Sequence, residues 1–478
     1  MNIQTKIHDK FSIEFKMGFT NRESADTNNF AVNVWIFTPN NLDINANTFD
    51  KNRFYQSVKS NVRLITPNFS LSDLANNNSL PWQNLHSALS NAPSKEKKIN
   101  YLFHIKMFAA IFKNSLRHEV DDIQLISETE EKKKRLEKLH TNLQTILYQY
   151  RNIQRHFAEK NRDIASVLQF GDEYMSHIVD VQISRAIFQN QQAVPTSTQK
   201  LSTFLIQERK YKSECKYSHI STENPTQNSL LISRHSLLKK YIESALYLKV
   251  NKTPDNLILQ QISLSTAAGI ALIVSTLISL PFEKFLSHYP IIIFAIVVLA
   301  YMCKDIVKEL MRKRFSKRIR GRFYDNKNIL NFKGEEIGCI KEVFNHISDE
   351  KVPTEVLAIR NRSELEIDNN SLEERTLLYR KQVEIKTSSL HHKFSYKYSG
   401  IYDIIRIHFQ DFTHKMDDPI VELQTIDEQG NKVSIQTLRT YTFHIVLQYV
   451  QEEKSDYCGY QILATRDGIL SCKKLPIL

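Results

Sequence analysis

Two long apolar segments lie close together near the middle of the chain. Residues 257–282 contain no Asp, Glu, Lys, Arg or His, and in residues 285–303 the only side chain that could be charged near neutral pH is His288. About 20 apolar residues in a helix are enough to cross the hydrocarbon core of a membrane. The connection between the segments is short and contains two prolines. The sequence therefore predicts a transmembrane helical hairpin over residues 257–303.

Basic residues follow the second apolar segment directly and account for more than half of the net charge of +12. Because basic residues concentrate on the cytoplasmic side of membrane spans, both ends of the hairpin are expected in the cytoplasm, which predicts a protein of the bacterial inner membrane. The polar first residues, which lack the apolar core of a signal peptide, agree with this orientation. These basic residues are Lys304, Lys308, Arg312, Lys313, Arg314, Lys317, Arg318, Arg320 and Arg322.

The same basic segment, residues 304–322, has two possible partners. A nucleic acid is one, and the anionic head groups of a lipid bilayer are the other. Its position immediately after a predicted span favours the lipid interpretation and a basic juxtamembrane helix, and it makes a nucleic-acid partner unlikely.

A stripe of small residues runs along the first apolar segment at intervals of four. Small side chains at this spacing allow another helix backbone to approach closely. The stripe is expected to pack against the second segment of the same chain or, alternatively, to serve as a self-association face. Its members are Ser263, Ala267, Ala271, Ser275 and Ser279.

A heptad pattern of apolar residues begins at Leu136 and continues in the same register to Val181. Such a pattern predicts long helices that bury one seam. Two interpretations remain open: an antiparallel helical hairpin within the chain, and a coiled coil between chains that would make a homo-oligomer.

The order of these patterns predicts a multi-domain membrane protein. Its α-rich N-terminal part would hold strand and loop residues 1–95, including a short β-hairpin, and a helical cytoplasmic domain over residues 96–250. The two-helix transmembrane hairpin follows, and the chain would end in a cytoplasmic α+β domain with an antiparallel sheet over residues 323–478.

Alternating apolar residues predict individual strands at both ends of the chain. Residues 11–19 and 30–37 alternate strictly and are expected to pair as a hairpin. In the C-terminal domain, strands are predicted after residue 400, with a turn at residues 427–431. Residues 340–347 are predicted to be helical, whereas residues 356–359 suggest a strand.

A few C-terminal side chains suggest chemistry. Asp368 followed by Glu384 and Lys386 resembles the carboxylate and Glu-x-Lys arrangement of metal-dependent nucleases, in which carboxylates hold Mg²⁺ and the lysine positions a water. His408 and His414 lie in a segment rich in aspartate that could contribute metal ligands. Both patterns are short, and a strand end followed by a turn explains the second equally well.

Cofactor motifs are absent from the sequence. The chain has only 10 glycines and contains neither of the common glycine-rich nucleotide-binding motifs. Its five cysteines include no C-x-x-C pair. We therefore expect no cofactor and no structural metal site.

Three C-terminal segments carry a resemblance. Residues 398–406 (YSGIYDIIR), 415–419 (KMDDP) and 466–469 (RDGI) resemble the C-terminal part of bacterial membrane-associated proteins of unassigned function. This resemblance implies a bacterial origin and no particular activity.

The sequence therefore favours a scaffold or sensor of the inner membrane that oligomerises through helices over an enzyme. Two alternatives remain: a membrane-tethered, metal-dependent hydrolase or nuclease, and a defence-type effector that permeabilises membranes.

Overall fold

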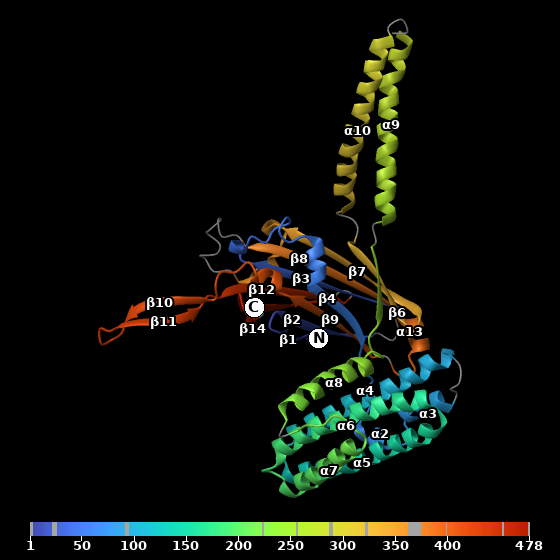
Figure 1. The fold of residues 1–478 in the computed structure, drawn as a ribbon, viewed down its shortest axis with the longest axis vertical. Helices are drawn as coiled ribbons and strands as arrows, with labels where there is room; N and C mark the ends of the chain where they lie inside the picture. The colour runs from blue at the N-terminus through green and yellow to red at the C-terminus, as the bar shows by residue number, and fades with distance from the viewer. Residues whose placement is uncertain are drawn as a thin grey trace. The chain divides into compact units, whose positions relative to one another are not determined.

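The chain forms two compact units in the computed structural model (Figure 1). The first, the sheet unit, comprises residues 1–61, 249–389 and 404–478, and the second, the helical unit, comprises residues 62–248 and 390–403. The structure describes residues 3–21, 26–90, 95–221, 224–254, 257–285, 290–320, 324–361, 374–397, 399–451 and 454–476.

An antiparallel sheet of eight strands forms the centre of the sheet unit. Its strand order is β14-β13-β12-β3-β8-β7-β6-β5, so strands from both ends of the chain meet in its middle. β3 (Thr27–Thr38) pairs with β12 on one side and β8 on the other. The other strands are β5 (Lys249–Pro254), β6 (Asn326–Phe332), β7 (Glu335–Ile347), β8 (Arg375–Lys386), β12 (Tyr441–Gln451), β13 (Lys454–Thr465) and β14 (Gly468–Lys474).

A second sheet has the order β1-β2-β9-β4. The strands predicted at residues 11–19 and 30–37 are confirmed as β2 and β3, but the hairpin predicted between them is wrong. β2 pairs with β1 and lies beside β9, whereas β3 pairs with β12 and β8 in the larger sheet. The strands of this sheet are β1 (Ile3–Asp9), β2 (Ser12–Thr20), β4 (Val58–Leu64) and β9 (Gly400–His408).

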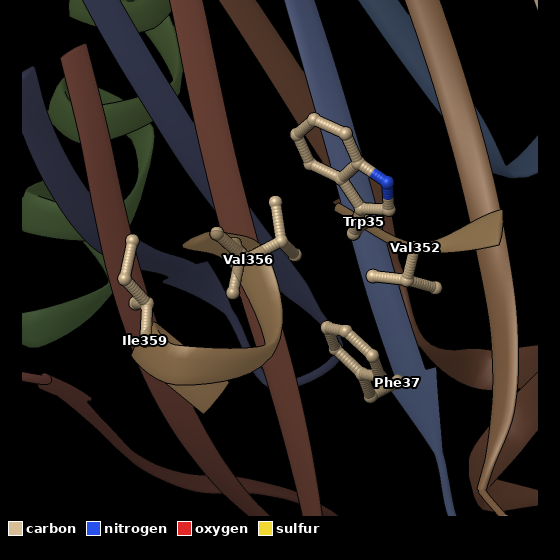
Figure 2. Close-up of a cluster of buried hydrophobic side chains, with 6 residues drawn as sticks. Trp35, Phe37, Val352, Val356 and Ile359 are labelled. Atoms are coloured by element: carbon tan, nitrogen blue, oxygen red, sulfur yellow. The ribbon is translucent and has the colours of Figure 1, made fainter. Parts of the chain in front are cut away.

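The short helix α11 (Thr354–Arg360) covers part of the large sheet, as Figure 2 shows. Trp35 and Phe37 project from β3 and pack against Val352, Val356 and Ile359. Each of these side chains is buried, and full burial of a large apolar side chain stabilises a fold by about 1.5–3 kcal/mol. This cluster fixes α11 on the sheet.

Two predictions for this region were wrong. Residues 340–347 belong to β7 rather than to a helix, since their backbone pairs with both β6 and β8. Residues 356–359 lie in α11 rather than in a strand, and Pro353 occupies the N-cap position. The remaining short helices are η1 (Asn40–Leu42), α1 (Lys51–Ser57), η2 (Asp349–Lys351), α13 (Thr387–Lys393) and α14 (Gln410–Thr413).

The helical unit is a bundle whose helices begin at clear sequence signals. Asn161 caps α6 by accepting bonds from the amides of Asp163 and Ile164, and Pro195 and Pro225 occupy the first positions of α7 and α8. The helices are α2 (Leu71–Ala75), α3 (Leu80–Ser90), α4 (Lys95–Leu125), α5 (Thr129–Lys160), α6 (Arg162–Asn190), α7 (Pro195–Glu214) and α8 (Pro225–Glu243).

The first part of the heptad seam is buried inside this bundle. α5 packs on α6 and α7, and α6 also packs on α4. The seam residues of α5 therefore contact helices of their own chain, as the intramolecular interpretation requires. They are Leu136, Leu139, Leu143, Ile146 and Tyr150.

Helices α9 (Leu257–Phe285) and α10 (Pro290–Arg320) lie between β5 and β6 in the chain and pack against each other. Among the residues that the structure describes, no helix combines the length and apolar content needed to cross a membrane. Polar side chains recur along α9, and α10 becomes strongly charged after Cys303. The predicted transmembrane hairpin was therefore wrong, as were the membrane-protein fold class and the inner-membrane location that rested on it.

Strands β10 (Ile420–Ile426) and β11 (Lys432–Leu438) form a separate two-stranded antiparallel sheet, which we call the β-arm. Its turn is the one predicted at residues 427–431, where the Asp427 carboxylate accepts bonds from the amides of Gln429 and Asn431. Gly430 has a φ of 85°, a conformation that favours glycine.

Candidate functional site

In the described structure, the residues of the predicted Glu-x-Lys pair take part in ion pairs. Glu384 and Lys386 share a face of β8, but Glu384 accepts bonds from the Lys341 ammonium group at 2.6 Å and the Cys339 thiol at 3.3 Å. Lys386 donates to Glu336 at 3.4 Å. The third predicted residue, Asp368, lies outside the described residues. No described group of three or more acidic, histidine or cysteine residues could hold a metal ion.

Electrostatics supports an ion pair as the role of Glu384. Burial alone would raise the pKa of this carboxyl, but the hydrogen bonds from Lys341 and Cys339 outweigh it and hold the pKa below its usual value. The same bond to Glu384 raises the pKa of Lys341. Both side chains are therefore charged near neutral pH and neutralise each other.

The structure does bring His408 and His414 together, although not around a metal. His408 Nε2 lies 2.9 Å from Gln410 Oε1, and Gln410 Nε2 lies 3.1 Å from His414 Nε2. On the other side, His408 Nδ1 lies 2.9 Å from the Ser12 hydroxyl. A serine beside an imidazole could act as a nucleophile. Ser12 is only 3% exposed, however, so the pair joins β2 to β9 rather than meeting a substrate.

The small-residue stripe of α9 lies along its contact with α10. Ala267 and Ala271 are fully buried, and Ala300 of α10 is also buried. Ser275 is half-buried, whereas the side chains of Ser263 and Ser279 lie outside the described ones. Alanine-sized side chains on both helices allow the two backbones to approach closely.

Large apolar side chains point away from this contact and into solvent. We call this set the hairpin surface. On α9 it consists of Ile262, Leu272, Ile273 and Leu277, and on α10 of Ile291, Ile292, Phe294, Val298, Leu299, Tyr301, Met302, Ile306 and Leu310. Among the described side chains, the pair of helices therefore buries Ala267, Ala271 and Ala300 and exposes most of its large apolar residues.

The predicted lipid-binding residues occupy the second half of α10, with Arg322 outside the described residues. Lys304 lies over the Tyr301 ring at 3.5 Å, and Arg312 lies 3.6 Å from Glu309. Lys308 and Arg314 are exposed. The side chains of Lys313, Lys317, Arg318 and Arg320 are not among those described. α10 thus has an apolar first half and a basic second half.

The helical unit contains a buried ionic network that the sequence analysis missed. The Arg151 guanidinium of α5 donates to Asp172 of α6 at 3.1 Å and to both carboxylate oxygens of Glu208 of α7, at 2.9 and 2.7 Å. It also donates to Ser176 at 3.1 Å. Asp172 and Ser176 lie one helical turn apart among apolar residues, and this spacing is the sequence signal that could have revealed a polar face of α6.

Two tyrosines complete this network. The hydroxyls of Tyr211 and Tyr217 donate to Asp172 at 2.8 and 3.1 Å, and the Arg151 guanidinium lies 3.7 Å from the centre of the Tyr211 ring. Burial, together with the Asp172 charge, raises the pKa of both phenols. Burial would lower the pKa of Arg151, but its bonds to Glu208 and the nearby carboxylates raise it. The network therefore ties α5, α6 and α7 to one another.

Two histidines face each other between α6 and α8. The rings of His177 and His235 have centres 3.4 Å apart, and Tyr174 stacks on His235 at 5.9 Å. Burial lowers the pKa of His177 to about 4, and burial together with the neighbouring His177 lowers the pKa of His235 to about 3. Both imidazoles are neutral near pH 7, which is what a close pair requires.

No family model, no curated protein and no solved structure matches this chain. The candidate site therefore rests on the geometry above, and its most unusual part is the hairpin surface.

Proposed function

We propose that this protein is a scaffold that self-associates through the hairpin surface. The observation that carries the proposal is the inverted arrangement of α9 and α10, with alanines inside and large apolar residues outside. Helices that stand alone in water normally turn their large apolar residues toward each other. The reverse arrangement leaves a surface that a further protein surface must cover.

The size of the hairpin surface agrees with a protein interface. Each of its large side chains leaves on the order of 100 Å² in solvent, so the set exposes on the order of 1,000 Å². Monomers rarely expose an apolar patch of more than a few hundred Å². A stable complex of standard size buries about 800 Å² on each partner. The hairpin surface, taken over both helices, is therefore large enough for a dimer.

The distribution of charge favours a second copy as the partner. The apolar first half of α10 carries no Lys or Arg between Pro290 and Cys303, whereas the second half is basic. Two hairpins that pack antiparallel would overlap their apolar halves and keep their basic halves at opposite ends. A parallel pair would place the two basic halves side by side, where like charges repel.

The test is the mass of the full chain in solution, measured by size-exclusion chromatography with light scattering over a range of concentrations. The wild type should have at least twice the mass of the 55.9-kDa chain. The double substitution Leu272→Glu and Phe294→Glu should weaken association at least about 10-fold, because it would bury charges without partners. Phe188→Glu on α6 is the matched control, since Phe188 is 82% exposed and Phe294 is 70% exposed.

Three outcomes would contradict the proposal. The first is a wild type that stays monomeric, and the second is equal association of the wild type and the double variant. The third is a monomer that sediments with vesicles of phosphatidylcholine and phosphatidylglycerol, which would make lipid the partner. Salt gives a check on the antiparallel arrangement: the affinity should change little between 0.1 and 0.5 M NaCl, whereas basic halves placed side by side would associate more tightly at high salt.

A further inference from the structure

Charged side chains gather in the helical unit around the C-terminal end of α8. Lys239 and Glu243 lie one helical turn apart on α8, and Lys113 of α4 forms an ion pair with Glu243. Arg63 lies near the end of β4, where it forms an isolated β-bridge with Tyr247, just beyond α8. We call the four charged residues the basic cluster: Arg63, Lys113, Lys239 and Glu243.

The basic cluster contains more positive than negative charge. The Glu243 carboxylate is only 6% exposed, and burial alone would raise its pKa. The charges of Lys113, Arg63 and Lys239 outweigh this effect and hold the pKa of Glu243 below its usual value. Glu243 is therefore ionised and neutralises one of the three cations. Two positive charges in the cluster have no counter-charge within it.

Arg63 and Lys239 are the cations without a carboxylate of their own. In the part of the chain that the structure describes, neither side chain forms an ion pair, whereas Lys113 does. The Arg63 guanidinium donates to the Thr66 hydroxyl at 3.2 Å and lies 5.9 Å from the centre of the Tyr247 ring. Its Nε atom is buried and has no hydrogen-bond partner among the described atoms. A buried donor without an acceptor is unfavourable, and an acceptor bound at this place would satisfy it.

Two uncharged side chains border the basic cluster. Tyr174 of α6 is fully buried, and its hydroxyl lies close enough to Glu243 for that charge to act on it. The Tyr174 ring stacks on the ring of His235, whose Nε2 atom is buried and has no hydrogen-bond partner in the described structure. Burial and the charges of nearby groups, among them Lys113 and Lys239, lower the pKa of His235. The imidazole is therefore exposed to the positive field of the cluster.

We propose that the basic cluster binds a small dianion of the phosphate class, either inorganic phosphate or the phosphate group of a small molecule. A phosphate monoester carries close to two negative charges near neutral pH, which matches the two positive charges that lack a counter-charge. The Arg63 guanidinium has the geometry that suits phosphate oxygens, and Lys113 and Lys239 supply ammonium groups. His235 donates a further bond when its Nε2 atom carries the ring proton.

The exposure of these donors favours a small occupant. Lys239 is exposed, but Arg63, Lys113 and His235 are only partly exposed, and Glu243 is buried. A membrane surface or a nucleic acid would reach Lys239 and little else. A single phosphate group is small enough to approach the partly exposed donors as well.

The experiment is calorimetric titration of the full-length protein with inorganic phosphate and with methyl phosphate, at pH 7.5 and constant ionic strength. We expect at least one probe to saturate a site with a Kd of about 1 mM or tighter, and chloride to show no saturation. Tighter binding of methyl phosphate would assign the site to phosphorylated small molecules, and tighter binding of inorganic phosphate to the free ion. Cations near a helix C-terminus also stabilise its free carbonyl groups. If that is their whole role, neither probe will saturate, and the proposal fails.

Two neighbouring lysines of α8 provide a matched control. Both Lys239 and Lys240 are exposed, but only the charge of Lys239 acts on Glu243. Lys239→Gln should therefore weaken binding of the phosphate probe several-fold, whereas Lys240→Gln should leave it unchanged. Both substitutions change only exposed side chains, so both variants should fold. Equal losses would mean that general surface charge attracts the probe, which would refute the site.

Glu243→Gln tests the site in the opposite direction. This substitution removes the carboxylate that competes for Lys113, so a variant with a cooperative thermal transition should bind the phosphate probe several-fold more tightly. Unchanged or weaker binding by such a folded variant would contradict an anion at this place. The hairpin variant Leu272→Glu/Phe294→Glu should bind the probe as the wild type does, because this site is independent of the proposed self-association.

Discussion

Gly171 and Tyr150 make a sharp prediction about packing in the helical unit. Gly171 lies inside α6, where glycine usually weakens a helix by about 1 kcal/mol relative to alanine. A Cβ atom at this position would lie 2.2 Å from the Tyr150 hydroxyl oxygen and 3.2 Å from its ring carbon Cζ. Tyr150 is fully buried, so it has little room to move. Glycine is therefore kept here to make space for the tyrosine.

Two opposing effects decide the result of Gly171→Ala. The helix gains about 1 kcal/mol, whereas overpacking of a filled core costs about 1–3 kcal/mol. We expect a net loss of about 1 kcal/mol. In a Tyr150→Phe background the oxygen is gone, so the same alanine should be neutral or stabilise by up to about 1 kcal/mol. Tyr150→Phe by itself loses the 3.2 Å bond to the Leu168 carbonyl, worth about 1 kcal/mol.

The assay is urea unfolding followed by the fluorescence of Trp82. The chain has two tryptophans, and a Trp35→Phe background leaves only Trp82, which is buried in the helical unit beside Phe108. The four proteins of the double-mutant cycle are compared in this background. If Gly171→Ala costs the same free energy with tyrosine and with phenylalanine at position 150, the hydroxyl is not the obstacle and the reasoning fails.

Three further predictions concern buried groups. The free energy of unfolding should fall by about 2 kcal/mol as the pH drops from 6.5 toward 4. Over this range the unfolded chain binds a proton at each histidine, whereas the half-buried His177 and His235 of the folded chain stay neutral down to about pH 4 and 3. In the variant His177→Phe/His235→Phe, the free energy of unfolding, measured with denaturant at several pH values, should depend less on pH. Arg151→Leu leaves two buried carboxylates without their cation and should cost about 3–5 kcal/mol, measured as a lower urea midpoint, whereas an unchanged midpoint would mean that the network adds no stability. Gly338→Ala would place its Cβ atom 2.0 Å from the backbone oxygen of Glu384, so we expect little folded protein by circular dichroism, and a folded variant of normal stability would contradict this close approach.

Local patterns predicted several elements but not their partners. Strict alternation identified β2 and β3, since each turns one apolar face to a core. It could not show that β3 pairs with β12 and β8, because those contacts join residues more than 300 positions apart in the chain. β7 was taken for a helix for a related reason. β7 lies between β6 and β8 in the sheet and has buried residues on both faces, so its apolar residues do not alternate cleanly.

In the candidate site, too, the sequence indicated which residues share a face but not which residues they contact. That Glu384 and Lys386 share a face follows from the strand period alone, whereas their ionic partners lie on β7 and depend on the pairing of β7 with β8. Ala267 and Ala271 lie on one helical face, which follows from their spacing of four residues. Apolar content suggested a membrane around that stripe, because hydropathy counts residues without showing which surface they cover.

The attachment of α9 and α10 has a consequence for how the protein folds. β5 and β6 are neighbours in the large sheet, and Pro254 lies directly opposite Asn326 in their register. The helical pair therefore occupies the place of the tight turn in an ordinary β-hairpin. Closing a long loop costs more chain entropy than closing a short one. Because α9 and α10 are nearly equal in length, their packing early in folding would bring the ends of β5 and β6 side by side. The helical pair would then lower the entropy cost of pairing β5 with β6 at the edge of the sheet.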